Sequence, residues 1–199
     1  MSLSAVSWRP PVLAGRRVKL RGYERRDAPH IWRYASDAET TRYMAWERHR
    51  CPQEVDEFLD GAVADHYRRR QLEYALCLAE TDQLIGGLGL YVGDDEGVAE
   101  LGYVLCRDYW GAGLMPEAIT VLMHHGFTTT ELQRIYAPIF AENEKSRRTA
   151  EKVGLQFEGV QRSGGYYRGR RWDIAIYAMI RSDFDQGRLG LVSTALWRP

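Results

Sequence analysis

The stretch Asp108–Ala118 (DYWGAGLMPEA) lies between two apolar runs and constrains the fold more than any other part of the chain. Gly111 and Gly113 allow a tight turn and a close approach to the backbone that a side chain would prevent. Pro116 suits the first turn of a helix, and Glu117 suits the positive end of a helix dipole. A simple turn is one interpretation. The junction of a strand and a helix also gathers free backbone N–H groups, so the stretch predicts an anion-binding site.

Two common phosphate-binding loops do not fit this stretch. A P-loop ends in Gly-Lys followed by Ser or Thr, and the chain contains no such run. A dinucleotide-binding loop requires a third glycine at position 116, where Pro116 stands. The predicted anion site therefore belongs to another class of loop.

Hydrophobic periodicity places this stretch within a series of strands and helices. Their order and the predicted antiparallel hairpin over 73–92 are typical of an α+β layered domain with a mixed sheet. We expect helices over 28–36, 52–70, 116–128 and 143–153, and strands over 17–21, 73–79, 84–92, 98–106, 134–139, 157–161 and 173–180. A loop over 163–172 is expected to join the last two strands. The folded domain is expected to span 12–184, with 185–199 as a C-terminal tail that could be ordered only against a partner.

The composition excludes several classes of protein. The 27 Lys and Arg residues balance the 27 Asp and Glu residues, which argues against a chain that mainly binds nucleic acid. No apolar run reaches the length of a membrane span, and the first residues lack the pattern of a signal peptide. The three scattered cysteines, Cys51, Cys77 and Cys106, then indicate reduced thiols and a cytoplasmic location. No spacing of His, Cys or carboxylate residues predicts a metal site.

Three motifs along the chain follow one pattern. They are AELGY at 99–103, WGAGLM at 110–115, and AENEKSRR at 141–148 followed by EKVGL at 151–155. In this order they resemble the fourth strand, the acetyl-CoA loop and the Asn-x-x-Ser helix of the GNAT superfamily of N-acetyltransferases. Trp110 and Met115, which replace residues of the general loop, resemble the Rim-type acetyltransferases of ribosomal-protein N-termini. The resemblance covers about 12–184 and implies a GNAT fold, with about seven strands in a mixed sheet flanked by helices.

The resemblance implies that acetyl-CoA is the co-substrate. Its pyrophosphate would bind the main-chain amides of the glycine-rich loop, and its pantetheine arm would pair with the free edge of the preceding strand. Asn143 would bond to the cofactor arm, although it also suits a helix N-cap. Arg147 could reach the ribose phosphate or lie on a solvated helix face. The implied cofactor-binding residues are Tyr103, Val104, Leu105, Trp110, Gly111, Ala112, Gly113, Leu114, Met115, Asn143 and Arg147.

Glu100 is the candidate general base. It alternates with Leu101 and Tyr103 and therefore points away from both side chains. The resemblance implies that its carboxylate, directly or through water, takes a proton from the acceptor ammonium, because an amine attacks only as its free base. The alternative is a solvated charge at the start of a strand.

Ser146 is the candidate proton donor to the departing thiolate of CoA, again as the resemblance implies. It shares a helix face with Ala150 and Val153, which indicates that its hydroxyl points inward and needs a partner. The alternative is a hydrogen bond back to a carbonyl of its own helix.

Tyr43, Trp46 and Tyr167 are the candidate acceptor-binding residues, because they lie in two loops that the resemblance places around the acceptor. Aromatic side chains in loops can also simply cover the core.

The expected reaction is direct attack of a primary amine on acetyl-CoA in a ternary complex, since no cysteine is placed to form an acyl-enzyme. The acceptor is expected to be the N-terminus of a ribosomal or other protein. The alternatives are a small amine such as a polyamine, amino acid or antibiotic, and a non-catalytic sensor of acetyl-CoA. A homodimer is common in such folds, and neither nucleic acid nor a membrane is expected as a partner.

Overall fold

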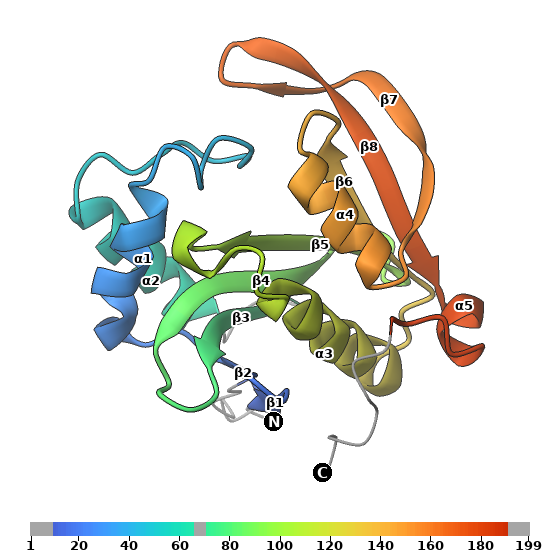
Figure 1. Cartoon of the computed structure of the whole chain (residues 1–199), viewed down its shortest axis with the longest axis horizontal. Coiled ribbons are helices and arrows are strands. Elements are labelled where there is room, and N and C mark those ends of the chain that lie inside the picture. Colours follow the sequence, from blue (N-terminus) through green and yellow to red (C-terminus); the bar gives the residue numbers. More distant parts are fainter. Residues whose placement is uncertain (1–9, 66–70, 191–199) are drawn as a thin grey trace, which may run out of the picture.

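The computed structural model of the chain describes residues 10–65 and 71–190. Its strands form an eight-stranded mixed sheet in the order β1-β2-β3-β4-β5-β6-β8-β7 (Figure 1). Every neighbouring pair is antiparallel except β5 and β6, which run parallel. The strands are β1 Leu13–Ala14, β2 Val18–Arg21, β3 Gln71–Leu78, β4 Leu84–Val92, β5 Val98–Leu105, β6 Arg134–Phe140, β7 Gln156–Tyr167 and β8 Arg170–Ile180.

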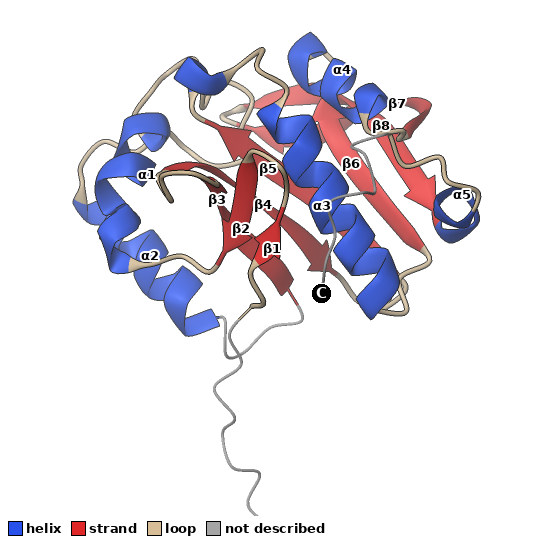
Figure 2. Ribbon diagram, turned by 60° about the horizontal axis from the view of Figure 1, so that its bottom comes forward, coloured by secondary structure: helices blue, strands red, loops and turns tan. Residues whose placement is uncertain are grey.

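Helices cover both faces of this sheet (Figure 2). The α1 and α2 helices (Ala28–Ala35 and Gln53–Asp65) pack on one face, where Ile31 and Leu59 join Ala75 of β3 in one apolar cluster. The α3 and α4 helices (Leu114–Thr129 and Glu144–Lys152) pack on the other face, where Ile119 joins Leu76 in the main core. Ala75 and Leu76 are neighbours in β3, and side chains alternate along a strand, so the two clusters lie on opposite faces. The predicted α+β class and mixed sheet are confirmed.

The parallel strands β5 and β6 separate partway along their length. Their pairing covers Val98–Glu100 with Arg134–Tyr136 and does not continue. Beyond Glu100, β5 pairs only with β4, up to Leu105 opposite Gly86. One edge of β5 from Leu101 to Leu105 is thus left outside the described sheet pairing, and the sheet splits at this point.

The end of the chain differs from the sequence prediction in two ways. The loop expected over 163–172 is wrong, because β7 and β8 continue as a hairpin to Tyr167 and Arg170. Its turn lies at Arg168 and Gly169, which both have positive φ, while the Gly-rich run before it is absorbed by a register shift between Gln161 and Gly165. A short helix follows, α5 (Arg181–Asp185), which the periodicity did not predict.

Three other predicted boundaries can be compared with the structure: the start of α3, the helix over 52–70 and the start of the tail. The α3 helix begins at Leu114 rather than Pro116, because Gly113 takes the left-handed conformation and serves as the N-cap. The predicted helix over 52–70 is confirmed as far as Asp65, and 66–70 lie outside the described residues. The predicted tail begins against the domain itself, since the Gly190 N–H donates to the Val153 carbonyl at 3.1 Å. The boundary at 184 stays a prediction.

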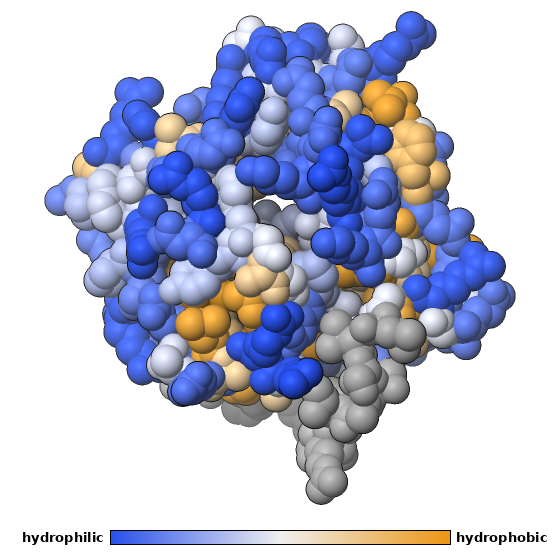
Figure 3. Space-filling model, viewed as in Figure 1, coloured by the Kyte–Doolittle hydropathy of each residue, from blue (hydrophilic) through white to orange (hydrophobic). Residues whose placement is uncertain are grey.

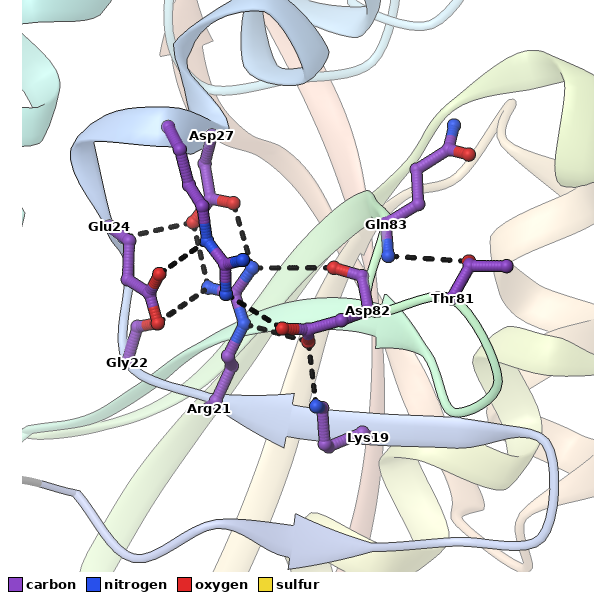
Figure 4. A network of polar contacts seen from close by, with 9 residues as sticks. Lys19, Arg21, Gly22, Glu24, Asp27, Thr81, Asp82 and Gln83 are labelled. Atoms are coloured by element: carbon purple, nitrogen blue, oxygen red, sulfur yellow. Dashed lines mark hydrogen bonds and ion pairs between the residues drawn. The ribbon is translucent and has the colours of Figure 1, made fainter.

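A polar network holds β2 in place (Figure 4). The Arg21 guanidinium donates to both carboxylate oxygens of Asp27 at 2.8 Å and to Asp82 at 3.0 Å. Lys19 forms a second ion pair with Asp82 at 2.7 Å. These contacts join β2, the 3₁₀ turn Arg25–Asp27 and the β3–β4 turn. The Arg21 and Asp27 side chains are only 6% and 3% exposed, so the pair is a buried structural ion pair.

Candidate active site

A cavity of about 720 Å³ passes through the split between β5 and β6. Its wall takes residues from both faces of the sheet. Figure 3, drawn in the view of Figure 1, shows a hollow over β5 and beside α4, rimmed mainly by hydrophilic residues. The predicted site residues that line the cavity are Tyr43, Trp46, Glu100, Tyr103, Val104, Asn143, Ser146 and Tyr167.

The glycine-rich loop has the backbone that the sequence predicted. Gly111 and Gly113 have φ values of 78° and 73°, in the left-handed region that favours glycine. A Cβ at Gly111 would meet nothing within 4 Å, so this residue is required by its conformation rather than by lack of space. The loop leads directly into α3, whose first N–H groups have no partner within the helix. The arrangement can hold an anion through backbone amides.

The side chains at both ends of the loop are used to fix it. The Trp110 indole N–H donates to the Leu105 carbonyl at 2.8 Å, and the Lys145 ammonium lies 4.1 Å from the centre of the Trp110 ring. Leu114 and Met115 are 6% and 5% exposed and pack in the main core. Any contact of these two residues with an anion would therefore come from their main-chain amides.

An ion pair that the sequence analysis missed lies behind the loop. The Arg17 Nη1 and Nη2 groups donate to the carbonyls of Ala112 at 2.8 Å and Gly113 at 3.2 Å. Arg17 Nε and its backbone N–H donate to the Glu117 carboxylate at 2.8 and 2.6 Å. Glu117 is only 3% exposed. Its place three residues after Leu114, on the buried side of α3, is the signal that could have indicated a partner.

Glu100 lies on the α1/α2 face of β5. Its Oε2 accepts a hydrogen bond from the Tyr136 hydroxyl at 3.1 Å, across the last paired residues of β5 and β6. Burial raises the pKa of Tyr136, and the neighbouring Glu100 carboxylate raises it further. Tyr136 therefore stays protonated near neutral pH and orients the Glu100 carboxylate in the cavity wall.

Ser146 lies on the opposite face, at the start of α4. Its hydroxyl forms a 2.7 Å hydrogen bond with the Tyr103 hydroxyl, a partner that neither interpretation from sequence included. Burial raises the pKa of Tyr103 to about 12, so the phenol stays protonated at neutral pH. Asn143 is the N-cap of α4, since its Oδ1 accepts from the Ser146 N–H at 3.2 Å, and it lines the cavity as well. The expected cap is thus present, and the expected bond from Asn143 to the cofactor arm stays a prediction.

The aromatic acceptor-side residues come from two segments that are far apart in the sequence. Tyr43 packs against Phe140 and Trp172, each at 6.2 Å between ring centres, and Tyr167 packs against Phe140 at 5.3 Å. In Figure 1 the tip of the β7–β8 hairpin reaches toward the segment that follows α1.

Arg168 holds the tip of the β7–β8 hairpin to that segment. Its guanidinium donates to the carbonyls of Thr41 at 2.6 Å, Arg42 at 3.3 Å and Trp46 at 2.9 Å. The hairpin and the loop over 37–49 thus form one wall of the cavity.

One predicted cofactor residue makes other contacts. The Arg147 Nε donates to the Tyr177 hydroxyl at 3.1 Å, and its guanidinium lies 5.9 Å from the centre of the Phe157 ring. These contacts direct the guanidinium toward β7 and β8. Its predicted contact with the ribose phosphate stays a prediction.

The cysteines offer little nucleophilic chemistry. Cys77 and Cys106 are buried in the α1/α2 cluster, and burial raises the pKa of the Cys77 thiol to about 12. None of the described residues that line the cavity is a cysteine.

In the described part of the chain, no group of three potential ligands could hold a metal ion, and no helix is long and apolar enough to cross a membrane.

Comparisons with known proteins agree with this geometry. A family model described as an acetyltransferase (GNAT) domain matches residues 17–156. The uncharacterized N-acetyltransferase YoaA of Bacillus subtilis (strain 168) is 30% identical over 172 residues, which cover 86% of this chain and 97% of the relative. The spermidine N(1)-acetyltransferase of Escherichia coli (strain K12) is 28% identical over 144 residues, which cover 71% of this chain and 74% of the relative.

A solved structure shares the fold. It is the ribosomal L7/L12 alpha-N-protein acetyltransferase RimL in complex with coenzyme A, and it has a TM-score of 0.76 at 19% sequence identity. The match covers 85% of this chain and 98% of that chain. The split sheet, the glycine-rich loop and the cavity between them thus occur in a fold that binds coenzyme A in this solved example.

Proposed function

The chain belongs to the GNAT acetyltransferase family, and from this premise we propose how it transfers an acetyl group from acetyl-CoA to a primary amine. The chain is an N-acetyltransferase with acetyl-CoA as its co-substrate. The observation that carries the proposed mechanism is the position of Glu100 and Ser146 in one cavity but on opposite faces of the split sheet.

The cofactor is proposed to lie along β5. Its pyrophosphate binds the amides from Gly111 to Met115, at the positive end of α3. Its pantetheine arm pairs with the edge of β5 that β6 leaves free, over Tyr103–Leu105, in the manner of an added strand. This path brings the thioester into the split, beside Asn143.

The acceptor amine is proposed to approach from the α1/α2 face. Glu100 takes the ammonium proton, and the free amine attacks the thioester carbonyl. The N–C bond forms and main-chain amides of β5 hold the oxyanion. The attached nitrogen then loses its second proton to water, and the C–S bond breaks as the carbonyl forms again. The thiolate leaves toward the α3/α4 face and receives the Ser146 proton, which solvent replaces. The Tyr103 phenol can direct its own proton at the Ser146 hydroxyl, so that the serine proton is free for the thiolate.

Two observations support direct attack in a ternary complex. Glu100 and Ser146 lie on opposite faces of the sheet, and none of the described residues that line the cavity is a cysteine. Buried thiols such as Cys77 ionise with difficulty, so an acetylated cysteine is not expected. Trapping an acetyl-cysteine that turns over at the catalytic rate would contradict this mechanism.

The acceptor is proposed to be the N-terminus of a ribosomal or other protein. RimL, whose structure shares the fold, acts on a ribosomal protein as its name states. A small polyamine is the second candidate, because a relative is a spermidine acetyltransferase and because two carboxylates, Glu73 and Glu100, line the cavity.

The test is release of free CoA thiol with a panel of amines, in wild type, Glu100→Gln and Ser146→Ala. The panel holds peptides with N-terminal Ala or Ser, polyamines, amino acids and aminoglycosides. For the class of amine that the wild type acetylates, we expect kcat/KM to fall about 100-fold in Glu100→Gln, which is the lower range for loss of a general base. Unchanged kcat/KM in Glu100→Gln would remove Glu100 from the mechanism. A wild type that binds acetyl-CoA but acetylates no amine would leave the proposed acceptors without support.

Assembly and location are proposed more coarsely. The β7 strand is an edge of the sheet, and Phe157 and Val160 on it are 50% and 45% exposed. We propose that this edge pairs two copies in a homodimer, located in the cytoplasm. Light scattering of the purified chain, with Val160→Lys as the variant, tests the dimer; a monomeric wild type would contradict it.

A further inference from the structure

Arg17 is bound to the back of the glycine-rich loop from a distant part of the chain. It lies just before β2, and its side chain makes contact with three residues of the junction, Ala112, Gly113 and Glu117. No motif for the loop includes this position. The contacts are of the forked kind that a guanidinium makes and an ammonium cannot reproduce.

The geometry of the peptide group turns these contacts into a constraint on the loop. In a planar trans peptide the C=O and N–H groups point in opposite directions. The Ala112 carbonyl is drawn toward Arg17, so the Gly113 N–H in the same peptide group is directed away from Arg17. The Gly113 carbonyl accepts from Arg17 at 3.2 Å and from the Glu117 N–H of α3 at 3.4 Å, and both contacts direct the Leu114 N–H away.

The loop lies at the surface, since Gly111 and Ala112 are exposed and Gly113 is half-buried. A Cβ built at Gly113 would meet only Arg17 Nη2, at 3.5 Å, and one at Gly111 would meet nothing within 4 Å. Freed of Arg17, the Ala112–Gly113 peptide could rotate, because glycine permits many backbone conformations. We propose that Arg17 is a positioning residue, which keeps the Gly113 and Leu114 amides directed at the pyrophosphate of acetyl-CoA.

Glu117 completes the arrangement. Its side chain is 4% exposed, and its carboxylate accepts hydrogen bonds from the Nε and backbone N–H groups of Arg17. The two Nη groups of Arg17 are then available to the loop carbonyls. Because the charges of Arg17 and Glu117 cancel, the pair adds no net charge beside an anion. It acts on the anion by orienting the Gly113 and Leu114 amides. The inference rests on the proposed position of the pyrophosphate.

The experiment compares a ligand that has the pyrophosphate and its nucleotide with one that lacks both. Binding of CoA is measured by calorimetry, and turnover is measured with S-acetylpantetheine, which has the thioester arm but no pyrophosphate. The variants are Arg17→Lys, the double variant Arg17→Met with Glu117→Met, and the exposed neighbour Arg16→Gln as a control. The double variant is included because Arg17→Met alone would leave the buried Glu117 carboxylate unpaired and could unfold the chain.

We expect CoA to bind roughly tenfold more weakly in Arg17→Lys and in the double variant, a loss of about 1.4 kcal/mol, with Arg16→Gln unchanged. Turnover of S-acetylpantetheine should stay at the wild-type rate in all of them. Equal losses with both substrates would mean a general structural role and would overturn the inference, as would wild-type CoA binding in the double variant. A wild type that binds no CoA would overturn the proposed function itself, an outcome distinct from these.

Discussion

Arg17 lies just before β2 and Arg21 is its last residue, and the two serve different parts of the molecule. Each pairs with a buried carboxylate, Glu117 at 2.8 Å and Asp27 at 2.8 Å. Arg21 is 6% exposed, and its other partners, Asp82 and the Gly22 carbonyl, hold β2 to the neighbouring turns. Arg17 is 49% exposed, and its remaining donors reach carbonyls of the proposed cofactor loop.

The comparison shows that an arginine–carboxylate pair has no fixed role. What decides the role is where the remaining donors of the guanidinium go. The contacts of Arg21 with neighbouring turns give it a role in stability. The contacts of Arg17 with carbonyls of the proposed cofactor loop suit it to its proposed role in ligand binding. Variants at the two positions should therefore change different measured quantities.

The largest effect is expected for Arg21→Met. It leaves Asp27 buried without its partner, and breaking a buried ion pair costs about 3–5 kcal/mol in the free energy of unfolding. Urea unfolding measures this loss, and CoA affinity of the folded fraction should stay unchanged. The exposed pair between Arg25 and Asp60 provides the control, because Arg25→Met should cost about 0–1 kcal/mol. A drop in CoA affinity in Arg21→Met, with little change in stability, would break the comparison.

Much of the fold could be predicted because periodicity and glycine chemistry are local signals. The helix stripe of α3, the hairpin of β3 and β4 and the tight turn at Gly111 and Gly113 are each predicted from neighbouring residues. The extension of β7 and β8 past 163–172 was missed, because SGG is typical of a turn and only the pairing partner shows that the strands continue.

The residues of the candidate site also fall into those that the sequence predicted and those that it did not. Residues within a motif, such as Glu100, Asn143 and Ser146, were found from the sequence and line one cavity. Arg17 and Arg168 were not assigned roles, because their contacts reach residues about a hundred positions away and depend on how the strands are arranged. A polar residue at a buried helix position, Glu117, was the one local sign of such a contact.

Arg168 extends the comparison to the acceptor side. Like Arg17, it donates to backbone carbonyls of a loop, those of Thr41, Arg42 and Trp46. Unlike Arg17, its carboxylate partner, Glu47 at 3.9 Å, is exposed. We therefore expect a functional effect: Arg168→Gly should raise the acceptor KM about tenfold, a loss of about 1.4 kcal/mol, with the acetyl-CoA KM unchanged. Glycine is chosen because Arg168 has a φ of 52°, which glycine adopts without strain.

The exposed neighbour Arg171 provides the matched control for Arg168. It lies over the Tyr166 ring at 5.5 Å on the same hairpin, away from the 37–49 loop. Steady-state kinetics with both substrates varied would separate the two KM values. An unchanged acceptor KM in Arg168→Gly, or an equal rise in Arg171→Ala, would remove Arg168 from the group of arginines that act on function.

The smallest expected effect is a pH dependence of the stability of the fold, which arises from the ion pairs of Asp82 in the Arg21 network. Burial opposes ionisation of Asp82, but hydrogen bonds from Lys19 and Arg21 outweigh it and lower the pKa of Asp82 to about 2. An unfolded aspartate has a pKa of about 3.9, so between these values the unfolded chain binds a proton that the folded chain does not. The ion pairs of Asp82 therefore stabilise the fold fully above about pH 4, and this stabilisation is lost as the pH falls toward 2.

Asp82→Asn tests this point without straining the turn, because asparagine tolerates the positive φ of 60° found at this position. Wild type should melt at a higher temperature than Asp82→Asn at pH 7, and the difference should shrink steadily between about pH 4 and pH 2. The exposed Asp94, changed to Asn, should show no such trend. A difference between wild type and Asp82→Asn that stays constant down to pH 2 would mean that Arg21 is satisfied by Asp27 alone. The stability role of Arg21 would then rest on one carboxylate, as the ion pair of Arg17 does.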